Sequence, residues 1–370
     1  MQDIDQLISE IYLIKEPNIA PEPFLKAFKG LSSRLQGNVV PWDKALPEKA
    51  YRAIEQQQKQ YKQEVESLDL SYLAEVFIPT QQVLDCLQPA KINLEKYQEY
   101  QGYDPTGHVA SFKPNKDGFA KVVEYNRTLN VTGRFKTVSG PMMLHLPKIY
   151  RSVLTSRFEN GAIYSLDYKS LEPRVLLSIS GTQPKEDTDN DIYQAVKTKL
   201  FNDSEIQRED IKKIVLSELY GAGIDLIRQR LPNVKNVEEV IEQINQYFGL
   251  EQLRSKLLQE WKSNNNKFIT NFYGRRVRTE TTHTLVNHYV QSTAVDVALL
   301  GFKNILNFLE EIQETQNIVP LFILHDALIL DVHPNCFRFI NSLCKVGSVD
   351  IKNMESVRFY MSADKDFATP

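Results

Sequence analysis

Two aspartates that lie far apart in the chain share one kind of position, the point where an apolar run ends. Asp167 follows residues 162–166, which have the composition of a buried strand, and Asp326 lies with His325 between two apolar runs that predict a β-hairpin. A carboxylate held at a strand end can coordinate Mg²⁺, which prefers a few carboxylates together with water and substrate phosphates. Each aspartate also has a simpler interpretation, a helix N-cap for Asp167 and a solvated turn residue for Asp326.

A cationic stripe lies between these aspartates in the sequence. Four residues recur every fourth position, which places them on one face of a helix: Arg208, Lys212, Leu216 and Tyr220. Cations at one end and an aromatic ring at the other suit a ligand that carries phosphates and a flat base. The alternative is an amphipathic surface helix with a basic face.

The elements predicted to position these residues are strands and helices of a mixed fold. After Asp167 the apolar spacing changes from that of a strand to that of a helix, with Pro173 near the helix start. Helical patterns also cover residues 1–66, 67–100 and 222–262, and the first begins with an apolar stripe from Ile4 to Ile14. Residues 101–130 are irregular and basic, which indicates a boundary between subdomains.

Composition limits the class of protein. The 370 residues suffice for one large domain or for two or three subdomains, and the net charge is −3. Basic residues are nevertheless concentrated, with nine Lys/Arg against two Asp/Glu in residues 105–157 and five against none in residues 262–278. Such tracts indicate a local phosphate-binding surface, although solvated helix faces are the alternative. No apolar run approaches membrane-spanning length and the N-terminus is polar, which predicts a cytoplasmic location without a membrane partner.

The segment around Asp167 resembles motif A of the family A (DNA polymerase I-like) DNA polymerases, whose pattern is D-Y-S-x-x-E-x-R. Four residues match in register: Asp167, Tyr168, Glu172 and Arg174. Lys169 stands where the family has Ser. The cationic stripe resembles motif B, which ends in a Tyr-Gly pair, here Tyr220 and Gly221. Leu216 departs from that motif, because the family carries Phe or Tyr there.

The hairpin resembles motif C, V-H-D-E. His325 and Asp326 match, and Ala327 replaces the Glu, a loss that we expect to weaken catalysis without abolishing it. Residues 141–147 keep the two prolines of a further family segment but lack its amides, which predicts weak checking of the minor groove. Shorter motifs also match in order, with Tyr in place of His in one of them: Arg134, Tyr193, Arg275, Arg276, Asn287 and Gln291.

The resemblance implies roles for the matching residues. Asp167, Asp326 and the backbone carbonyl of Tyr168 are expected to hold two Mg²⁺ ions, for which Mn²⁺ can substitute, and Lys212 to protonate the leaving pyrophosphate. Glu172 is expected to exclude a 2′-hydroxyl. The residues expected at the incoming nucleotide are Arg208, Lys212, Leu216, Tyr220, Glu172 and Tyr193. Those expected at the DNA are Arg134, Arg275, Arg276, Asn287, Gln291, His325 and Gly221.

The implied fold is α+β, a right-hand polymerase with an antiparallel-sheet palm and helical fingers and thumb. The expected divisions are a helical N-terminal or thumb region at 1–130, palm with motif A at 131–180, fingers with motif B at 181–262, and palm with motif C at 263–370. The implied partners are primer-template DNA and deoxynucleoside triphosphates. The chain leaves no room for the 3′–5′ exonuclease domain that often precedes this module, so we expect proofreading to be absent or supplied by another chain.

Two other functions remain open at this stage, together with further partners. The size suggests a phage-like enzyme that works with a separate exonuclease, helicase-primase or processivity factor. A related polymerase that uses ribonucleotides is one alternative, which Glu172 disfavours. A catalytically inactive polymerase-fold protein that binds DNA or acts as a replication accessory is the other, and Pro173, Leu216 and Ala327 keep it open.

Overall fold

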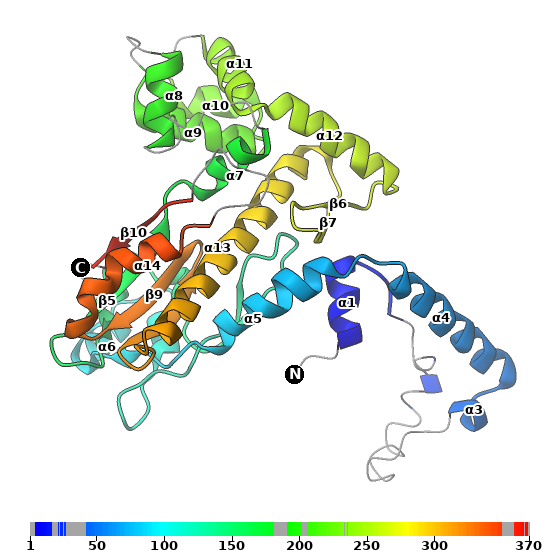
Figure 1. Cartoon of the computed structure of the whole chain (residues 1–370), viewed down its shortest axis with the longest axis horizontal. Coiled ribbons are helices and arrows are strands. Elements are labelled where there is room, and N and C mark those ends of the chain that lie inside the picture. Colours follow the sequence, from blue (N-terminus) through cyan, green and yellow to red (C-terminus); the bar gives the residue numbers. More distant parts are fainter. Residues whose placement is uncertain are drawn as a thin grey trace. The chain divides into compact units, whose positions relative to one another are not determined.

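The computed structural model describes residues 4–16, 21, 23–24, 26, 42–180, 191–201, 206–232, 234, 236–349, 359–365 and 367–368 (Figure 1). The chain forms two compact units, Met1–Leu73 with Gly274–Arg276, and Ala74–Tyr273 with Val277–Pro370. The expected divisions after residues 130, 180 and 262 stay predictions.

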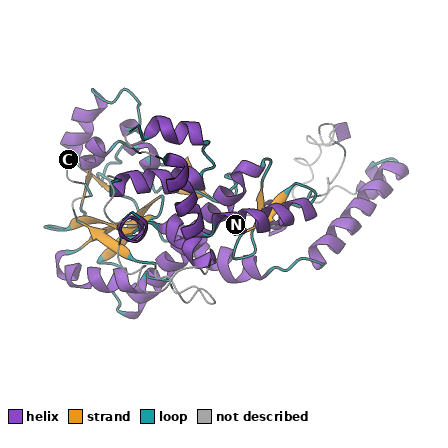
Figure 2. Cartoon of the chain, turned by 90° about the horizontal axis from the view of Figure 1, so that it is seen from above, coloured by secondary structure: helices purple, strands orange, loops and turns teal. Residues whose placement is uncertain are grey.

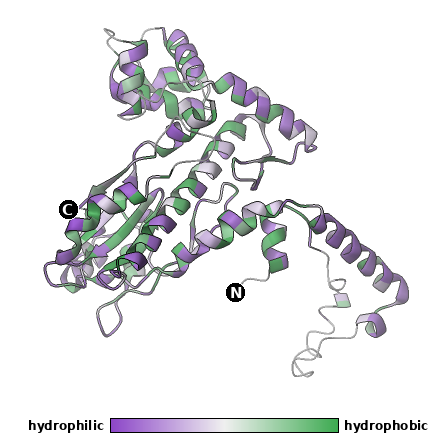
Figure 3. Ribbon diagram, in the orientation of Figure 1, coloured by the Kyte–Doolittle hydropathy of each residue, from purple (hydrophilic) through white to green (hydrophobic). Residues whose placement is uncertain are grey.

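The first unit is helical in its described part. It contains α1 (Ile4–Tyr12), α3 (Trp42–Ala45) and α4 (Glu48–Glu66). Four positions of the apolar stripe predicted between Ile4 and Ile14 are buried: Leu7, Ile8 and Ile11 of α1, and Ile14 just after it. The Tyr61 hydroxyl of α4 donates a hydrogen bond of 3.1 Å to the carbonyl of Asp5. Most of α4 is hydrophilic, as the Gln, Lys and Glu content of this stretch predicts (Figure 3).

A four-stranded antiparallel sheet lies at the centre of the second unit, with strand order β10-β5-β9-β8. Its strands are β5 (Ala162–Tyr168), β8 (Ile318–Leu324), β9 (Ala327–Val332) and β10 (Met361–Asp364). The pairing of Leu324 with Ala327 leaves His325 and Asp326 as a two-residue turn, so the predicted β-hairpin is confirmed. Smaller two-stranded sheets pair β1 (Lys91–Ile92) with β4 (Leu154–Thr155), β2 (Glu124–Asn126) with β3 (Lys136–Ser139), and β6 (Phe268–Thr270) with β7 (Arg276–Arg278).

Helices make up much of the rest of the second unit (Figure 2). They are α5 (Ile78–Asp85), α6 (Leu94–Gln101), α7 (Leu171–Ser180), α8 (Ile192–Leu200), α9 (Arg208–Leu219), α10 (Ile224–Arg230), α11 (Val237–Phe248), α12 (Leu250–Ser263), α13 (Leu285–Glu311) and α14 (Ile340–Val346). Short helical turns are η1 (Tyr72–Phe77), η2 (Val109–Phe112), η3 (Met143–His145), η4 (Lys148–Val153), η6 (Thr282–Thr284) and η7 (Pro334–Phe339). None of the helices described has the length and hydropathy needed to cross a membrane.

The strand-to-helix change predicted after Asp167 is present, although the strand continues to Tyr168. Helix α7 begins at Leu171 and has Pro173 in its first turn. Asp167 is therefore a strand residue, paired with Ala327 of β9, and the N-cap interpretation is wrong.

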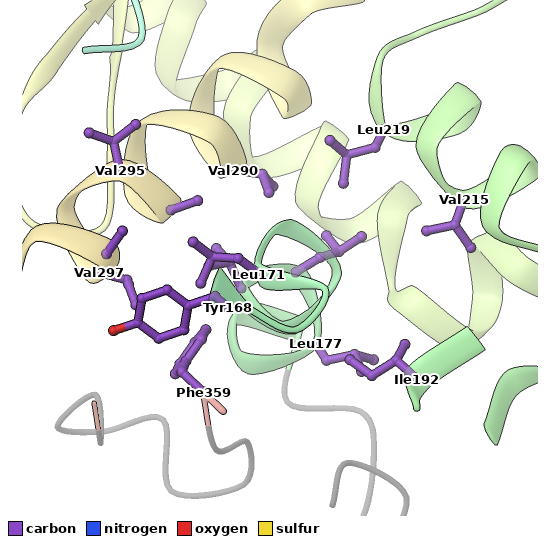
Figure 4. Close-up of a cluster of buried hydrophobic side chains, with 14 of the residues drawn as sticks. Tyr168, Leu171, Leu177, Ile192, Val215, Leu219, Val290, Val295, Val297 and Phe359 are labelled. Atoms are coloured by element: carbon purple, nitrogen blue, oxygen red, sulfur yellow. The ribbon is translucent and has the colours of Figure 1, made fainter. Parts of the chain in front are cut away.

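The two faces of the sheet pack against different cores, because side chains alternate along each strand. On β5, Leu166 and Tyr168 join a core that includes residues of α7, α13 and α14, and Figure 4 shows Tyr168 close to Val297 and Phe359. Ile163 points to the opposite face and belongs to a second core, which includes apolar residues of the segment 87–154 and of β8 and β9. By the same alternation Asp167 belongs to that second face, at the end of the strand where the apolar packing stops.

A buried carboxylate fixes the register between β5 and β9. Asp331 of β9 is fully buried and accepts hydrogen bonds from the Ser156 hydroxyl (2.5 Å), the Arg157 amide (2.9 Å) and Arg157 Nε (3.2 Å). Ser156 and Arg157 shortly precede β5, so these bonds hold the start of β5 against β9. In the resulting register Ile163 lies opposite Asp331, and Asp167 lies opposite Ala327.

The close packing of α13 on β5 gives a stability prediction. A Cβ added at Gly301 would lie 1.7 Å from the Tyr168 hydroxyl, which donates a hydrogen bond of 2.5 Å to the carbonyl of Gly347. Ala favours a helix over Gly by about 1 kcal/mol. We expect the clash to outweigh this gain, so that Gly301→Ala lowers the free energy of unfolding by about 1–3 kcal/mol in urea titrations.

Gly223→Ala is the matched control for this change, because nothing lies within 4 Å of a Cβ at Gly223. Removing the hydroxyl as well, with Tyr168→Phe, should recover part of the loss. Equal stability of Gly301→Ala and wild-type protein would contradict the packing described here.

Candidate active site

The sheet brings Asp167 and Asp326 together. Asp167 is the second-last residue of β5, and Asp326 is in the turn that leads into β9. The amide of Tyr168 donates a 3.4 Å hydrogen bond to the carbonyl of Asp326, so the backbones of these two segments are in contact. Two acids that are 159 positions apart in the sequence (326 − 167) thus lie at one edge of the sheet.

The pKa values of both Asp167 and Asp326 are raised at this edge of the sheet. Burial, and next the negative charge of Asp167, raise the pKa of the Asp326 carboxyl to about 7. The pKa of Asp167 is also raised, mainly by burial and further by the charge of Asp364, while Lys148 acts in the opposite direction.

A pocket of about 1040 Å³ opens beside Asp326. Its lining includes eight of the residues that the sequence predicts at the site: Arg134, Glu172, Tyr193, Leu216, Tyr220, Gln291, His325 and Asp326. Apolar residues extend the wall of the pocket, among them Leu129, Val131, Met142, Leu144 and Leu171. Charged groups and an apolar wall in one open pocket suit a ligand that has both phosphate and ring surfaces.

Glu172 is the centre of a polar network in the pocket. Arg134 Nη2 lies 2.5 Å from Glu172 Oε1, and the Tyr220 hydroxyl donates a 2.9 Å hydrogen bond to Oε2. With its amide oriented so that Nε2 donates to Thr132 Oγ1 at 2.7 Å, Gln291 accepts from both terminal nitrogens of Arg134 at 3.0 and 3.1 Å. Arg134 and Tyr220 therefore fix the position of the Glu172 carboxylate, and Gln291 in turn holds Arg134.

Helix α9 places three residues of the predicted cationic stripe on one face, Arg208, Lys212 and Leu216, whereas Tyr220 follows as the C-cap of the helix. The buried residues of this helix occupy other positions, whereas Lys212 is exposed and Leu216 is half-buried. Arg208 forms an ion pair of 2.5 Å with Asp191 and lies over the ring of Tyr193, 5.4 Å from its centre. Asp191 also caps α8, accepting hydrogen bonds from the amides of Tyr193 and Gln194.

Tyr193, which was expected at the incoming nucleotide, is buried and is not exposed as a phosphate-binding residue would be. Its side chain is 4% exposed, and its hydroxyl forms a hydrogen bond with Ser170, in the loop between β5 and α7. Burial raises the pKa of Tyr193 to about 12, so the ring is neutral near pH 7. The residue connects α8 to the loop that follows Asp167.

Three further residues that were predicted to contact the DNA are His325, Asn287 and Gly221, and each lies in a different segment. His325 has a left-handed backbone (φ 57°), and partial burial and then the charge of Arg134 lower its pKa. Asn287 is half-buried on α13, one turn before Gln291. A Cβ at Gly221 (φ 69°) would meet the His283 carbonyl at 2.5 Å.

The two arginines of the G-R-R segment belong to the first unit and do not line the pocket. Arg275 is buried, and Arg276 Nη1 donates a 2.8 Å hydrogen bond to the carbonyl of Tyr12.

Sequence reasoning did not assign several residues that the structure brings to the site. Thr132, Ser170 and Asp191 hold Gln291, Tyr193 and Arg208, and each lies close in sequence to a recognised motif. Lys148 and Asp364 act on Asp167, yet neither carries a local signal, because strand pairing and chain folding bring them there.

Comparisons with known proteins agree with this geometry. The chain has the same fold as the POL domain of Pol1 from M. smegmatis, determined in complex with DNA primer-template and dNTP, with a TM-score of 0.64 and 14% sequence identity over 99% of this chain and 82% of that one. A sequence comparison with curated proteins gave no significant match. The expected α+β polymerase fold is confirmed.

The sequence also matches the model of one protein family, described as DNA polymerase family A, over residues 80–346. This match spans well over half of the chain. The protein therefore belongs to DNA polymerase family A and is a DNA-directed DNA polymerase.

Proposed function

We propose that this polymerase adds deoxynucleotides to a primer 3′-hydroxyl by phosphoryl transfer at Asp167 and Asp326, which hold two Mg²⁺ ions. The observation that carries the proposal is the meeting of these two acids at the sheet edge, where burial and then the charge of Asp167 raise the pKa of Asp326. A divalent cation bound between two carboxylates relieves the repulsion between their charges. Mg²⁺ suits this site because it prefers oxygen ligands. The bound ions would lower the pKa of the attacking hydroxyl and neutralise charge on the phosphates.

The side chains of α9 provide the charges that the triphosphate requires. Lys212 is exposed, and we propose that it binds the phosphates and protonates the leaving pyrophosphate. Arg208 would bind the same group, and its ion pair with Asp191 orients its guanidinium while leaving it 35% exposed. The Tyr168 carbonyl would be a further metal ligand beside Asp167.

The polar network around Glu172 supports a role in selecting the sugar. Arg134 and Tyr220 fix the Glu172 side chain at the pocket wall, so it cannot move aside at low cost for an additional hydroxyl. We propose that it rejects ribonucleotides, and that Tyr220 and Leu216 contact the nascent base pair and the sugar. The relative Pol1 was determined with primer-template and dNTP, and we propose the same ligands for this chain.

The direct test is primer extension on a defined template. With Mg²⁺ and dNTPs we expect extension by the wild-type protein, and Asp167→Asn should reduce the rate by about 10³-fold or more, because positioning and charge neutralisation supply most of the catalysis. A gel assay with an end-labelled primer measures both rates. Glu124→Gln, which changes an exposed acid of β2, is the control and should retain the wild-type rate.

Further arms of this assay separate the alternatives. Extension with ribonucleotides as fast as with dNTPs would contradict the role of Glu172, and extension by neither protein would favour the inactive, DNA-binding alternative. A primer incubated without nucleotides should remain intact, since we predict no proofreading activity from this chain. Shortening of the primer would contradict that prediction.

The pKa of Asp326 predicts how stability depends on pH. Its folded-state value of about 7 lies above the ordinary value of 3.8, so the folded protein keeps a proton that the unfolded chain releases. This group therefore stabilises the fold at low pH, and its contribution is lost as the pH rises toward and through 7. Urea unfolding of the metal-free protein at pH 5 and pH 8 should show this loss, and Asp326→Asn should reduce it.

Saturating Mg²⁺ should restore stability at pH 8 in the wild-type protein more than in Asp326→Asn. The proposed coupling would be contradicted if the two proteins showed the same change in stability between pH 5 and pH 8.

A further inference from the structure

Strand β10 places a third acid on the same face of the sheet as Asp167. Ser362 pairs with Asp167, and Asp364 pairs with Ser165. Because side chains alternate along a strand, Asp364, Ser165 and Asp167 all belong to one face. Residues related diagonally in this way have Cα atoms about 7–8 Å apart, within reach of each other's side chains.

The opposite neighbour of Asp167 lacks any oxygen on its side chain. Ala327 of β9 pairs with Asp167 from the other side and is buried. The row across the sheet therefore runs from Ser362 through Asp167 to Ala327, and β9 contributes no acid at the position after Asp326. Among the strands of this sheet, the acid nearest to Asp167 on this face is therefore Asp364 of β10, and not a residue of β9.

Asp364 lies among charged groups at this end of the sheet. It is exposed, and it is close enough to Asp167 for their charges to interact, as is Lys148. Asp364 also acts on Arg151, whose guanidinium lies over the ring of Phe367 at 4.5 Å. Two acids and two bases therefore share the open end of this face.

We propose that Asp364 is a positioning residue of the metal site, which hydrogen-bonds a water molecule bound to the ion at Asp167. This proposal rests on the proposed two-metal function. In the part of the chain that the structure describes, no three His, Cys, Asp or Glu side chains converge closely enough to hold a metal directly, which favours a contact through water. Mg²⁺ keeps several waters in its protein sites, so an acid at this range can orient one of them.

The test measures Mn²⁺ binding to the DNA-free protein by electron paramagnetic resonance, with primer extension against Mg²⁺ concentration as a second readout. We expect Asp364→Asn to weaken Mn²⁺ binding about tenfold and to raise the half-saturating Mg²⁺ concentration by a similar factor, as loss of an outer-shell partner does. The melting temperature should change little, because Asp364 is exposed. The control variant is Asp117→Asn, which changes an exposed acid in a turn far from Asp364 in the sequence. It should bind Mn²⁺ as the wild type does.

A rescue variant distinguishes a role at the metal from a structural one. Ala327→Glu supplies an acid on the other side of Asp167 and should restore Mn²⁺ binding in the Asp364→Asn background. Unchanged Mn²⁺ binding in Asp364→Asn would overturn the proposal. An equal loss in Arg151→Gln would also overturn it, because Asp364 would then act only by holding Arg151.

Asp167→Asn separates this inference from the proposed function. If Asp167→Asn abolishes Mn²⁺ binding and Asp364→Asn leaves it unchanged, only the role of Asp364 fails. If Mn²⁺ binding is the same in the wild type and Asp167→Asn, the proposed two-metal function fails and the inference fails with it.

Discussion

The antiparallel pairing of β5 with β9 is the constraint on which the site depends. It sets Asp167 opposite Ala327, and the two-residue turn before Ala327 then leaves Asp326 beside the end of β5. A slip of one residue would turn Asp167 to the opposite face, into the core around Leu166 and Tyr168, because side chains alternate along the strand. The buried Asp331, bonded to Ser156 and Arg157, opposes such a slip from the other end of the strands.

This arrangement opposes folding in one respect. Two acids are held together at a partly buried edge, and burial together with their repulsion raises the pKa of Asp326. Apolar packing on both faces of the sheet supplies the stability that offsets it, with Tyr168 and Leu166 on one face and Ile163 on the other. A strained or repulsive group at a site that the rest of the fold supports is typical of catalytic centres.

The sequence predicted the parts of this site that local pattern determines. The strand ending near Asp167, the hairpin around His325 and Asp326, and the exposed face of α9 all follow from apolar periodicity within a few residues. The N-cap interpretation of Asp167 failed because the strand continues for one more residue and the helix begins only at Leu171. Element ends are set by tertiary packing as well as by local preference.

Contacts that join distant segments could not be predicted in the same way. The ion pair of Arg134 with Glu172, the bond of Tyr193 to Ser170 and the approach of Asp364 to Asp167 depend on how separate elements pack. The family resemblance brought Arg134, Glu172 and Tyr193 to attention but did not give their partners. Asp364 lies in the last strand, and only its register with β5 reveals it.

The most direct measurement of the central claim is a crystal structure of the protein soaked with Mn²⁺, a primer-template and an incoming nucleotide, with anomalous scattering to locate the metal. We predict two Mn²⁺ peaks about 4 Å apart, with the side chains of Asp167 and Asp326 among their ligands. Peaks bound elsewhere, or aspartates too far apart to share the ions, would contradict it.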